Sequence, residues 1–509
     1  MYTNVKSHGL FGIEGYTVNI EVDIYAGMPT YSTVGLPDAA VRESRERVQS
    51  AIKNSRYSFP IDKVIINLAP ADMRKEGTHY DLPIALGILV ATRQVSDKNI
   101  GRFSILGELA LDGTVRGING ILPMVIDACE RGEKNFIIPA ANAREAAHIE
   151  GVNIFAVENL KQAALFLDGK LDLEPTPIEN WQPDEEPKNN DFSLIQGQYS
   201  AKRAVEIAVA GGHNILLIGT PGSGKTMISR SIPSILPDLS KEEAIEITKI
   251  HSISGELSPN AGLISQRPYR SPHHTSSAAS LVGGSTKALP GEISLAHLGV
   301  LFLDEFPEFK RDVLEAMRQP LEDGFITVSR ATFRATYPAN FMLVAAMNPC
   351  PCGNYGSKHT KCRCSLQQIK RYQQRISGPM LDRIDLHIEM TEVEYSEFTN
   401  TVPAESSKSI KARVNAAREL QRNRYKGTNI LFNAQMDSAH INEFCSLDSD
   451  GEKLMEMAFS RLKLSARAYK RLKKVARTIA DLDNSQNISA AYISEAIQYR
   501  SLDSKYWGN

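Results

Sequence analysis

The sequence predicts an α/β fold with three domains, and two observations support this prediction. Three short apolar runs end in polar residues of the kind that line one edge of a nucleotide-binding parallel sheet, which indicates a P-loop core at residues 191–395. The pattern differs on either side of this core. Strand-like and helix-like runs alternate over residues 1–172, and apolar residues recur at helical spacing over residues 405–509. We therefore expect an α+β N-terminal domain, a central α/β P-loop domain and a helical C-terminal domain.

Composition and charge narrow the class of protein. At 509 residues the chain is too long for one hydrophobic core. Its net charge of −1 gives no global sign of nucleic-acid binding. No apolar run approaches the ~20 residues that cross a membrane, and the N-terminus lacks a signal peptide's apolar core. Six cysteines, four of them clustered, do not suggest a disulfide framework. We expect a cytoplasmic protein that does not enter membranes.

The N-terminal domain and its connection to the core follow from local patterns. We expect strands at residues 17–25, 63–68, 103–106 and 135–138, and helices at residues 38–54, 82–93 and 120–131. Residues 173–190 (LEPTPIENWQPDEEPKNN) hold four prolines with many acids and amides, which is typical of an interdomain linker.

The first apolar run of the core leads directly into a phosphate-binding motif. The run NILLI (214–218) is followed by GTPGSGKT and then by a helical pattern, which is the context that a P-loop requires. The glycines allow backbone N–H groups to curl around phosphate oxygens, the lysine supplies a charge for the β/γ-phosphates and the threonine offers a hydroxyl to Mg²⁺. The predicted ATP-binding residues are Gly219, Thr220, Pro221, Gly222, Ser223, Gly224, Lys225 and Thr226.

Two further strands end in residues suited to hydrolysis. The run GVLFL (299–303) ends at Asp304 and Glu305, and we expect Asp304 to orient Mg²⁺ and Glu305 to polarise the attacking water. The run FMLVAAM (341–347) ends at Asn348, whose side chain could hold that water near the γ-phosphate. Three strands that end in GKT, Asp-Glu and Asn form the pattern of an AAA+ ATPase.

Two segments of the core lie outside the minimal P-loop scaffold, and the C-terminal region is helical. Residues 253–297 form an insertion, and residues 322–339 predict a β-hairpin in which Ile326, Val328 and Phe333 alternate. Period-3.6 spacing predicts C-terminal helices at residues 409–424, 451–459, 466–480 and 489–499.

Longer motifs show a resemblance to a known family. The segments RPYRSPHHTSSAASLVGG (267–284), PGEISLAHLGVLFLDEFPEF (290–309), NPCPCG (348–353) and LDRID (381–385) are similar to the magnesium-chelatase-related AAA+ family. The segments at 67–89 and 106–123 indicate its ComM/YifB-type branch, so the resemblance covers nearly the whole chain. It implies a homohexameric ring that moves along single-stranded or branched DNA and drives branch migration during natural transformation.

The resemblance also assigns roles to three residues. Asn348 resembles sensor 1, Arg383 resembles the arginine finger that reaches a neighbouring subunit's γ-phosphate, and Arg467 resembles sensor 2 on a lid helix. The alternative for Arg383 is an ion pair with Asp382 or Asp385.

The N-terminal motifs resemble the proteolytic domain of Lon, but without its catalytic dyad. No serine stands at the nucleophile position of the loop at residues 75–83, and the segment RGINGILP (116–123) has no lysine base. Thr78 could be a nucleophile, yet the sequence shows no activating base near it. We expect a domain that packs, oligomerises or binds a partner rather than a peptidase.

Four cysteines on one loop predict a metal site. Cys350, Cys352, Cys362 and Cys364 fall within residues 350–364, and four thiolates can close a tetrahedral Zn²⁺ site. Free thiols or a redox pair are the alternative, and His359 could replace one thiolate. Cys129 and Cys445 stand in helical contexts and are expected to pack in cores.

Because the net charge gives no sign of nucleic-acid binding, DNA binding can be predicted only from local basic residues. Such residues would contact phosphates without reading bases. The roles of His273 and His274 stay open between metal binding and packing. The rival function is a chelatase-type ATPase that remodels a protein partner. The candidate DNA contacts are Arg330 on the predicted hairpin, Arg267 and Arg270 in the insertion, and Lys358, Lys361 and Arg363 on the cysteine loop.

Overall fold

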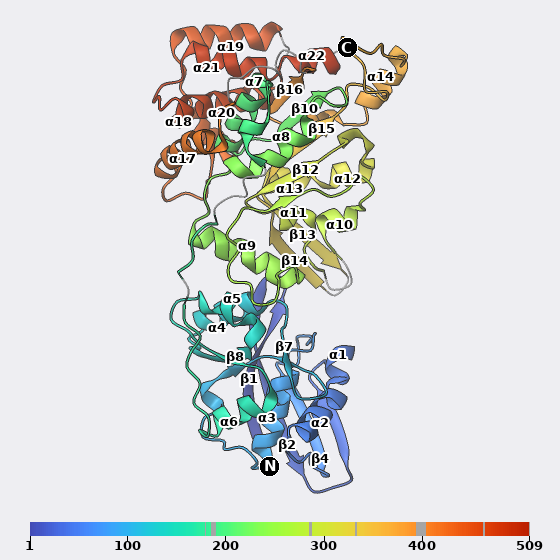
Figure 1. Ribbon diagram of the computed structural model, residues 1–509, viewed down its shortest axis with the longest axis vertical. Coiled ribbons are helices and arrows are strands. Elements are labelled where there is room, and N and C mark those ends of the chain that lie inside the picture. The colour runs from blue at the N-terminus through green and yellow to red at the C-terminus, as the bar shows by residue number, and fades with distance from the viewer. Residues whose placement is uncertain are drawn as a thin grey trace. The chain divides into compact units, whose positions relative to one another are not determined.

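The computed structural model describes residues 1–178, 180–184, 190–284, 288–330, 333–392, 404–461 and 464–507 (Figure 1). The chain divides into two compact units. The first contains residues 1–182, 241–265 and 331–336, and the second contains residues 183–240, 266–330 and 337–509. Residue 179 and residues 185–189 of the predicted linker lie outside the described residues.

The first unit is a seven-stranded sheet, with strand order β3-β4-β2-β1-β5-β8-β9, covered by helices. β1 and β2 form a long antiparallel hairpin, β4 pairs antiparallel with β2, and the remaining pairs are parallel. The strands are β1 (Tyr2–Phe11), β2 (Glu14–Tyr25), β3 (Thr30–Val34), β4 (Lys63–Ala69), β5 (Ser104–Ile105), β8 (Asn135–Pro139) and β9 (Asn153–Val157), with a separate pair β6 (Glu108–Leu109) and β7 (Val115–Arg116).

The helices of this unit pack on the sheet. They are α1 (Ala39–Arg42), α2 (Ser44–Asn54), α3 (Asp81–Ala91), α4 (Ile121–Glu130), α5 (Ala143–Ala147) and α6 (Leu160–Leu167). Every residue of α3 is buried, because this apolar helix packs on β1 and β2 and is covered on its other sides by α2 and α6. The predicted strands and the helices predicted at residues 82–93 and 120–131 are confirmed, whereas the helix predicted over residues 38–54 is divided at Glu43 into α1 and α2.

Strand β1 was not predicted, and its composition explains why. Ser7 and His8 are fully buried in it, and the His8 imidazole makes a 3.0 Å hydrogen bond with the Ser104 hydroxyl. Because buried polar residues interrupt the alternation of apolar side chains, the usual sign of a strand is absent.

A segment beyond the P-loop also belongs to the first unit. α9 (Lys241–Ser254) packs on α4, and Ala244 and Leu263 share a core with Ile121 and Val125. The Gly120 N–H donates to the Ser252 carbonyl at 2.9 Å. The chain therefore leaves the ATPase-motif unit after residue 240 and returns to it at residue 266.

The second unit contains a five-stranded parallel sheet with strand order β11-β12-β15-β10-β16. Its strands are β11 (Tyr269–Arg270), β12 (Val300–Leu303), β15 (Met342–Met347), β10 (Ile215–Gly219) and β16 (Leu386–Met390). β10, β12 and β15 are buried at every position, as expected for a parallel sheet covered on both faces. The predicted hairpin is confirmed as β13 (Phe325–Arg330) and β14 (Phe333–Pro338). Residues 331–332 and the side chain of Arg330 lie outside the described residues.

The C-terminal region is helical, as predicted, and shares a core with α7 (Tyr199–Gly211) (Figure 1). Its helices are α17 (Ser407–Arg424), α18 (Ser438–Phe444), α19 (Ser449–Arg461), α20 (Ala466–Leu482), α21 (Ala490–Gln498) and α22 (Leu502–Tyr506). Other helices of the unit are α8 (Lys225–Ser231), α10 (Ala278–Val282), α11 (Glu292–Leu295), α12 (Arg311–Ala316), α13 (Arg318–Asp323), α14 (Leu366–Gln373) and α15 (Gly378–Leu381). Among the described residues, no helix has both the length and the apolar character needed to cross a bilayer.

Candidate functional site

The phosphate-binding loop lies between the end of β10 and the start of α8. Gly222 and Gly224 have φ angles of 79° and 90°, a left-handed conformation that favours glycine. The Lys225 ammonium is buried and donates to the carbonyls of Gly219 (2.7 Å) and Thr220 (2.9 Å) and to the Asn348 side-chain oxygen (3.2 Å). Burial lowers the pKa of Lys225 to about 8, although Asp304 opposes this effect. The structure thus joins the predicted lysine to the predicted sensor asparagine.

The predicted magnesium ligands lie side by side. The Thr226 hydroxyl donates to the Asp304 carboxylate at 3.0 Å, although the two residues follow different strands. Neighbouring oxygens around an octahedral Mg²⁺ with ~2.1 Å bonds stand about 3.0 Å apart, so this hydroxyl and carboxylate fit the ion. Thr226 and Asp304 are the residues that would hold it.

The predicted water-polarising carboxylate contacts a histidine. Glu305 has a φ angle of 52°, and its carboxylate is half exposed and lies 3.0 Å from His274 Nδ1. The His274 ring packs edge-on against Phe309 and lies 4.1 Å, between centroids, from the His273 ring. The sequence left both histidines open, and the structure places His274 on Glu305. Spacing in the sequence offered no signal for this contact.

A cavity lies at the opposite edge of the sheet from the P-loop. It encloses about 690 Å³, and its wall includes Asn214, Phe341 and Asp385, which stand at the amino ends of β10, β15 and β16. Arg383 and Arg467 also line it, and we call this cavity the arginine pocket. The P-loop, Asp304 and Asn348 follow the carboxyl ends of these parallel strands. With ~3.3 Å per strand residue, five residues of β10 separate the two edges by about 16 Å.

Two of the arginines that line the pocket, Arg383 and Arg467, contact Glu322. Arg383 is 8% exposed, ion-pairs with Glu322, and donates to the carbonyls of Pro379 (2.7 Å) and Arg318 (3.1 Å). Arg467 is 60% exposed, and its guanidinium lies 3.8 Å from Glu322.

The expected alternative, an ion pair of Arg383 with Asp382 or Asp385, is not the one observed. Asp385 lies 3.4 Å from both His213 and Arg471. Burial alone would raise the pKa of Asp385, but the His213 hydrogen bond and the Arg471 charge hold it well below its usual range. The acidic partner of Arg383 is therefore Glu322. The sequence did not predict this pair, because nothing in the local context of Glu322 relates it to Arg383.

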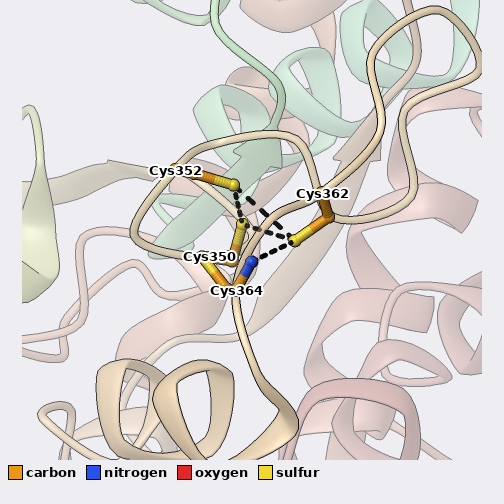
Figure 2. A group of neighbouring side chains, drawn as sticks. All are labelled: Cys350, Cys352, Cys362 and Cys364. Atoms are coloured by element: carbon orange, nitrogen blue, oxygen red, sulfur yellow. Dashed lines mark hydrogen bonds between the residues drawn. The ribbon is translucent and has the colours of Figure 1, made fainter.

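The four clustered cysteines converge on one point (Figure 2). Cys350 Sγ lies 3.4 Å from Cys352 and 3.7 Å from Cys362, Cys352 and Cys362 are 3.6 Å apart, and all four sulfurs lie within 4.8 Å of one another. A tetrahedral Zn²⁺ with ~2.3 Å bonds to sulfur holds its ligands about 3.8 Å apart. The spacing therefore fits this metal. His359 lies 3.6 Å from Glu392 instead of joining the group.

The electrostatic surroundings also suit metal binding by this cluster. Backbone N–H groups of Arg363 and Asn354 lower the pKa of Cys352 to about 6, whereas burial raises that of Cys350 to about 12. At neutral pH the cluster thus contains a stabilised thiolate, the form of cysteine that binds metal.

In the N-terminal unit, a carboxylate lies beside the candidate nucleophile. The Thr78 hydroxyl donates to Glu108, so the expectation that nothing near Thr78 could act as a base is wrong. Glu108 also lies 3.6 Å from Arg116. Lys75 is buried and donates to the Met73 carbonyl at 2.8 Å. A carboxylate is only a weak base for a hydroxyl, so the contact with Glu108 does not make Thr78 a strong nucleophile.

The candidate DNA contacts have different surroundings. Arg267 donates to the carbonyls of Pro237, Leu298 and Asp238, and Arg270 forms a bidentate pair with Glu292 at 2.7 and 2.8 Å. These contacts give both arginines a structural role within the fold. Lys358, Lys361 and Arg363 are exposed on the cysteine loop.

Comparison with known proteins gives matches along most of the chain. Residues 20–142 match the family described as subunit ChlI of Mg-chelatase, residues 191–398 match magnesium chelatase subunit ChlI, and residues 404–500 match its C-terminal family. The uncharacterized protein YifB of Escherichia coli is 45% identical over 501 residues, 98% of this chain and 97% of that protein. The competence protein ComM of Haemophilus influenzae is 42% identical over 503 residues, with the same coverage of 98% and 97%. The DNA replication licensing factor mcm6 of Dictyostelium discoideum is 23% identical over 206 residues, 40% of this chain and 20% of that protein.

Proposed function

Because the chain belongs to the magnesium chelatase ChlI family, in its YifB/ComM-type branch, we propose that it is an ATP-hydrolysing ring, a homohexamer, that moves DNA strands. In this proposal it drives branch migration of recombining DNA during natural transformation, in the cytoplasm. The N-terminal unit is a Lon-like domain without peptidase activity, and the C-terminal helices form the lid of the ATPase.

One observation supports the proposed ring: the residues assigned to the two halves of the ATPase site lie at opposite edges of one sheet. Lys225 and Asp304 are at the carboxyl edge, and Arg383 and Arg467 are in the arginine pocket at the amino edge. An arginine about 16 Å away cannot touch the chain's own γ-phosphate. A head-to-tail neighbour can supply it, and repetition of that contact closes into a ring.

The residues at the carboxyl edge divide the chemistry of hydrolysis. The P-loop backbone and Lys225 would hold the phosphates, and Thr226 and Asp304 would hold Mg²⁺, whose charge would offset that of the phosphates. Glu305 polarises the attacking water, and Asn348 orients it. His274 holds Glu305 until that carboxylate turns to the water.

DNA is the proposed substrate because full-length relatives include a competence protein, and a partial relative is a DNA replication licensing factor. The proposed contacts are exposed Lys358, Lys361 and Arg363 together with Arg330 on the hairpin. Arg267 and Arg270 are weaker candidates because carbonyls and Glu292 already engage them.

We also propose that the cysteine cluster binds one Zn²⁺ per chain. The sulfur spacing within 4.8 Å supports a closed four-thiolate site of structural type. Replacing Cys350 with serine should remove the metal, as measured by elemental analysis of protein purified without chelator.

The alternative function is a chelatase-type ATPase that remodels a protein partner, and the family descriptions favour it as the second candidate. The two functions differ in what activates ATP hydrolysis. A DNA motor responds to branched or single-stranded DNA, whereas a chelatase-type ATPase responds to its protein partner.

The test is ATP turnover by the purified full-length chain with and without a synthetic four-way junction, alongside strand exchange of that junction. We expect the junction to stimulate turnover and the protein to move its branch point only with ATP. Arg330→Ala should weaken binding of the junction more at low salt than at high salt, because loss of a phosphate contact reduces the salt dependence of binding. Lys453→Ala, an exposed lysine on α19, is the matched control. ATP turnover that no form of DNA changes would contradict the proposed DNA motor.

A further inference from the structure

We infer that the metal-loaded cysteine cluster braces the phosphate-binding loop, so that zinc occupancy sets the affinity of the protein for ATP. This inference rests on the proposed ATP and zinc sites and assigns to the metal a role in nucleotide binding. The brace is built from three contacts of the cysteine loop, all within the second unit.

The first contact is between the turn that carries two cysteines and the P-loop itself. The Gly353 N–H donates to the Cys350 carbonyl at 2.9 Å, which closes a turn over the first cysteine pair. A Cβ at Gly353 would lie 2.6 Å from Cγ and 2.7 Å from Cδ of Pro221. The Gly353 backbone, with φ at 82°, is therefore packed directly on the proline ring of GTPGSGKT.

The second contact lies just before the first cysteine. Asn348 precedes Cys350 by two residues, and its side-chain oxygen accepts a hydrogen bond from Lys225 at 3.2 Å. The Pro349 carbonyl between them accepts from Gln373 at 3.2 Å. A change in the position of Cys350 is thus passed to the lysine that holds the phosphates.

The third contact fixes the middle of the loop. Ser357 lies between the two cysteine pairs and donates to Glu392 at 2.6 Å. Glu392 follows β16 by two residues, and Met390 at the end of that strand pairs with Gly219, the first residue of the P-loop motif. The cysteine loop is therefore attached to both sides of the phosphate-binding loop.

Metal binding controls this brace because it closes the loop. Nine residues separate Cys352 from Cys362, and sulfur–sulfur contacts without a metal are too weak to hold such a segment closed. A metal bound by four thiolates crosslinks the two ends. A glycine-rich loop loses much conformational freedom when it binds phosphate, so a preordered wall beside it increases affinity.

The experiment measures nucleotide affinity against zinc content in the full-length protein. A fluorescent ADP analogue is titrated into zinc-loaded protein, into protein stripped with a chelator, and into stripped protein given one equivalent of Zn²⁺. We expect the Kd to rise about tenfold on stripping and to return with Zn²⁺. Cys352→Ser and Cys364→Ser should reproduce the stripped state, while Cys129→Ser, a cysteine of the first unit, should bind the analogue like the wild type.

A second variant tests the contact itself. Pro221→Ala removes the ring on which Gly353 packs, so its Kd, whatever its starting value, should change less than twofold when zinc is removed. A wild-type Kd that stays the same after verified zinc removal would contradict the inferred brace. A tenfold rise in the Kd of Pro221→Ala on zinc removal would contradict it as well. Protein that contains no zinc after preparation without chelator contradicts the metal site, and no binding of the analogue by any form contradicts the proposed ATPase. These failures are distinguishable.

Discussion

The two edges of the five-stranded parallel sheet carry different sets of polar and charged residues. The carboxyl edge carries two hydrogen-bonded pairs, Lys225 with Asn348 and Thr226 with Asp304. The amino edge gathers Arg383 and Arg467 around Glu322. The first edge carries the residues of a phosphate-binding motif, whereas the arginines of the second edge lie about one strand length away from them. In the proposed ring, each chain therefore supplies one half of each of two active sites.

The largest effect on ATP turnover should come from removing the Arg383 side chain at the amino edge. Arg383→Ala should lower kcat about 10³-fold, because a forked cation that stabilises charge on the transferring phosphoryl group is lost. ATP binding should persist, since the carboxyl edge is intact. Mixing Arg383→Ala with Lys225→Ala should restore part of the activity at interfaces that combine two intact halves. Steady-state turnover across mixing ratios checks this, and no rescue between subunits shown to exchange would place Arg383 outside the reaction.

Removing the water-polarising carboxylate of the carboxyl edge, Glu305, should have the next largest effect. Glu305→Gln should lower kcat about 10²-fold or more while it leaves nucleotide affinity near that of the wild type, because the groups that hold phosphate and Mg²⁺ remain. Single-turnover hydrolysis and equilibrium binding measure the two quantities separately. Turnover like that of the wild type would remove Glu305 from its assigned role.

The carboxyl edge alone should show a pH dependence from Lys225. Burial lowers its pKa to about 8 in the free protein, and the protonated form is the one that holds phosphate. Affinity is therefore full below pH 8 and lost as the pH rises through that value, so the Kd for ADP should increase about tenfold from pH 7 to pH 9. Lys225→Ala should bind more weakly and with a flat profile over the same range. A flat wild-type profile would contradict the assignment.

The smallest effect should come from the histidine beside Glu305. His274→Ala frees the carboxylate from its 3.0 Å contact, and we expect basal kcat to rise about threefold with an unchanged KM. His274→Gln keeps a hydrogen-bond donor and should stay near the wild-type rate. An unchanged or lower kcat in His274→Ala would mean that the contact does not restrain Glu305.

Local patterns predicted the elements of the fold well. The strands at 17–25, 63–68 and 135–138 and the C-terminal helices are all present, because apolar periodicity reports which face of a segment is buried. Strand β1 escaped prediction because buried Ser7 and His8 hide its alternation. The packing of residues 241–265 with the first unit also has no local signature, since Ala244 and Leu263 would suit either core.

By itself, the sequence determined the phosphate-binding loop, the acidic strand end after β12 and the four-cysteine loop. Each is contiguous or nearly so, and its chemistry follows from residue types at short spacing. Only the tertiary structure decided which groups meet. It placed His274 on Glu305, Glu322 between two arginines, Glu108 beside Thr78 and Gly353 on Pro221. The physical reason is that such contacts depend on the order and direction of strands in each sheet, which bring together residues 30 to 145 positions apart, and no local pattern carries that information.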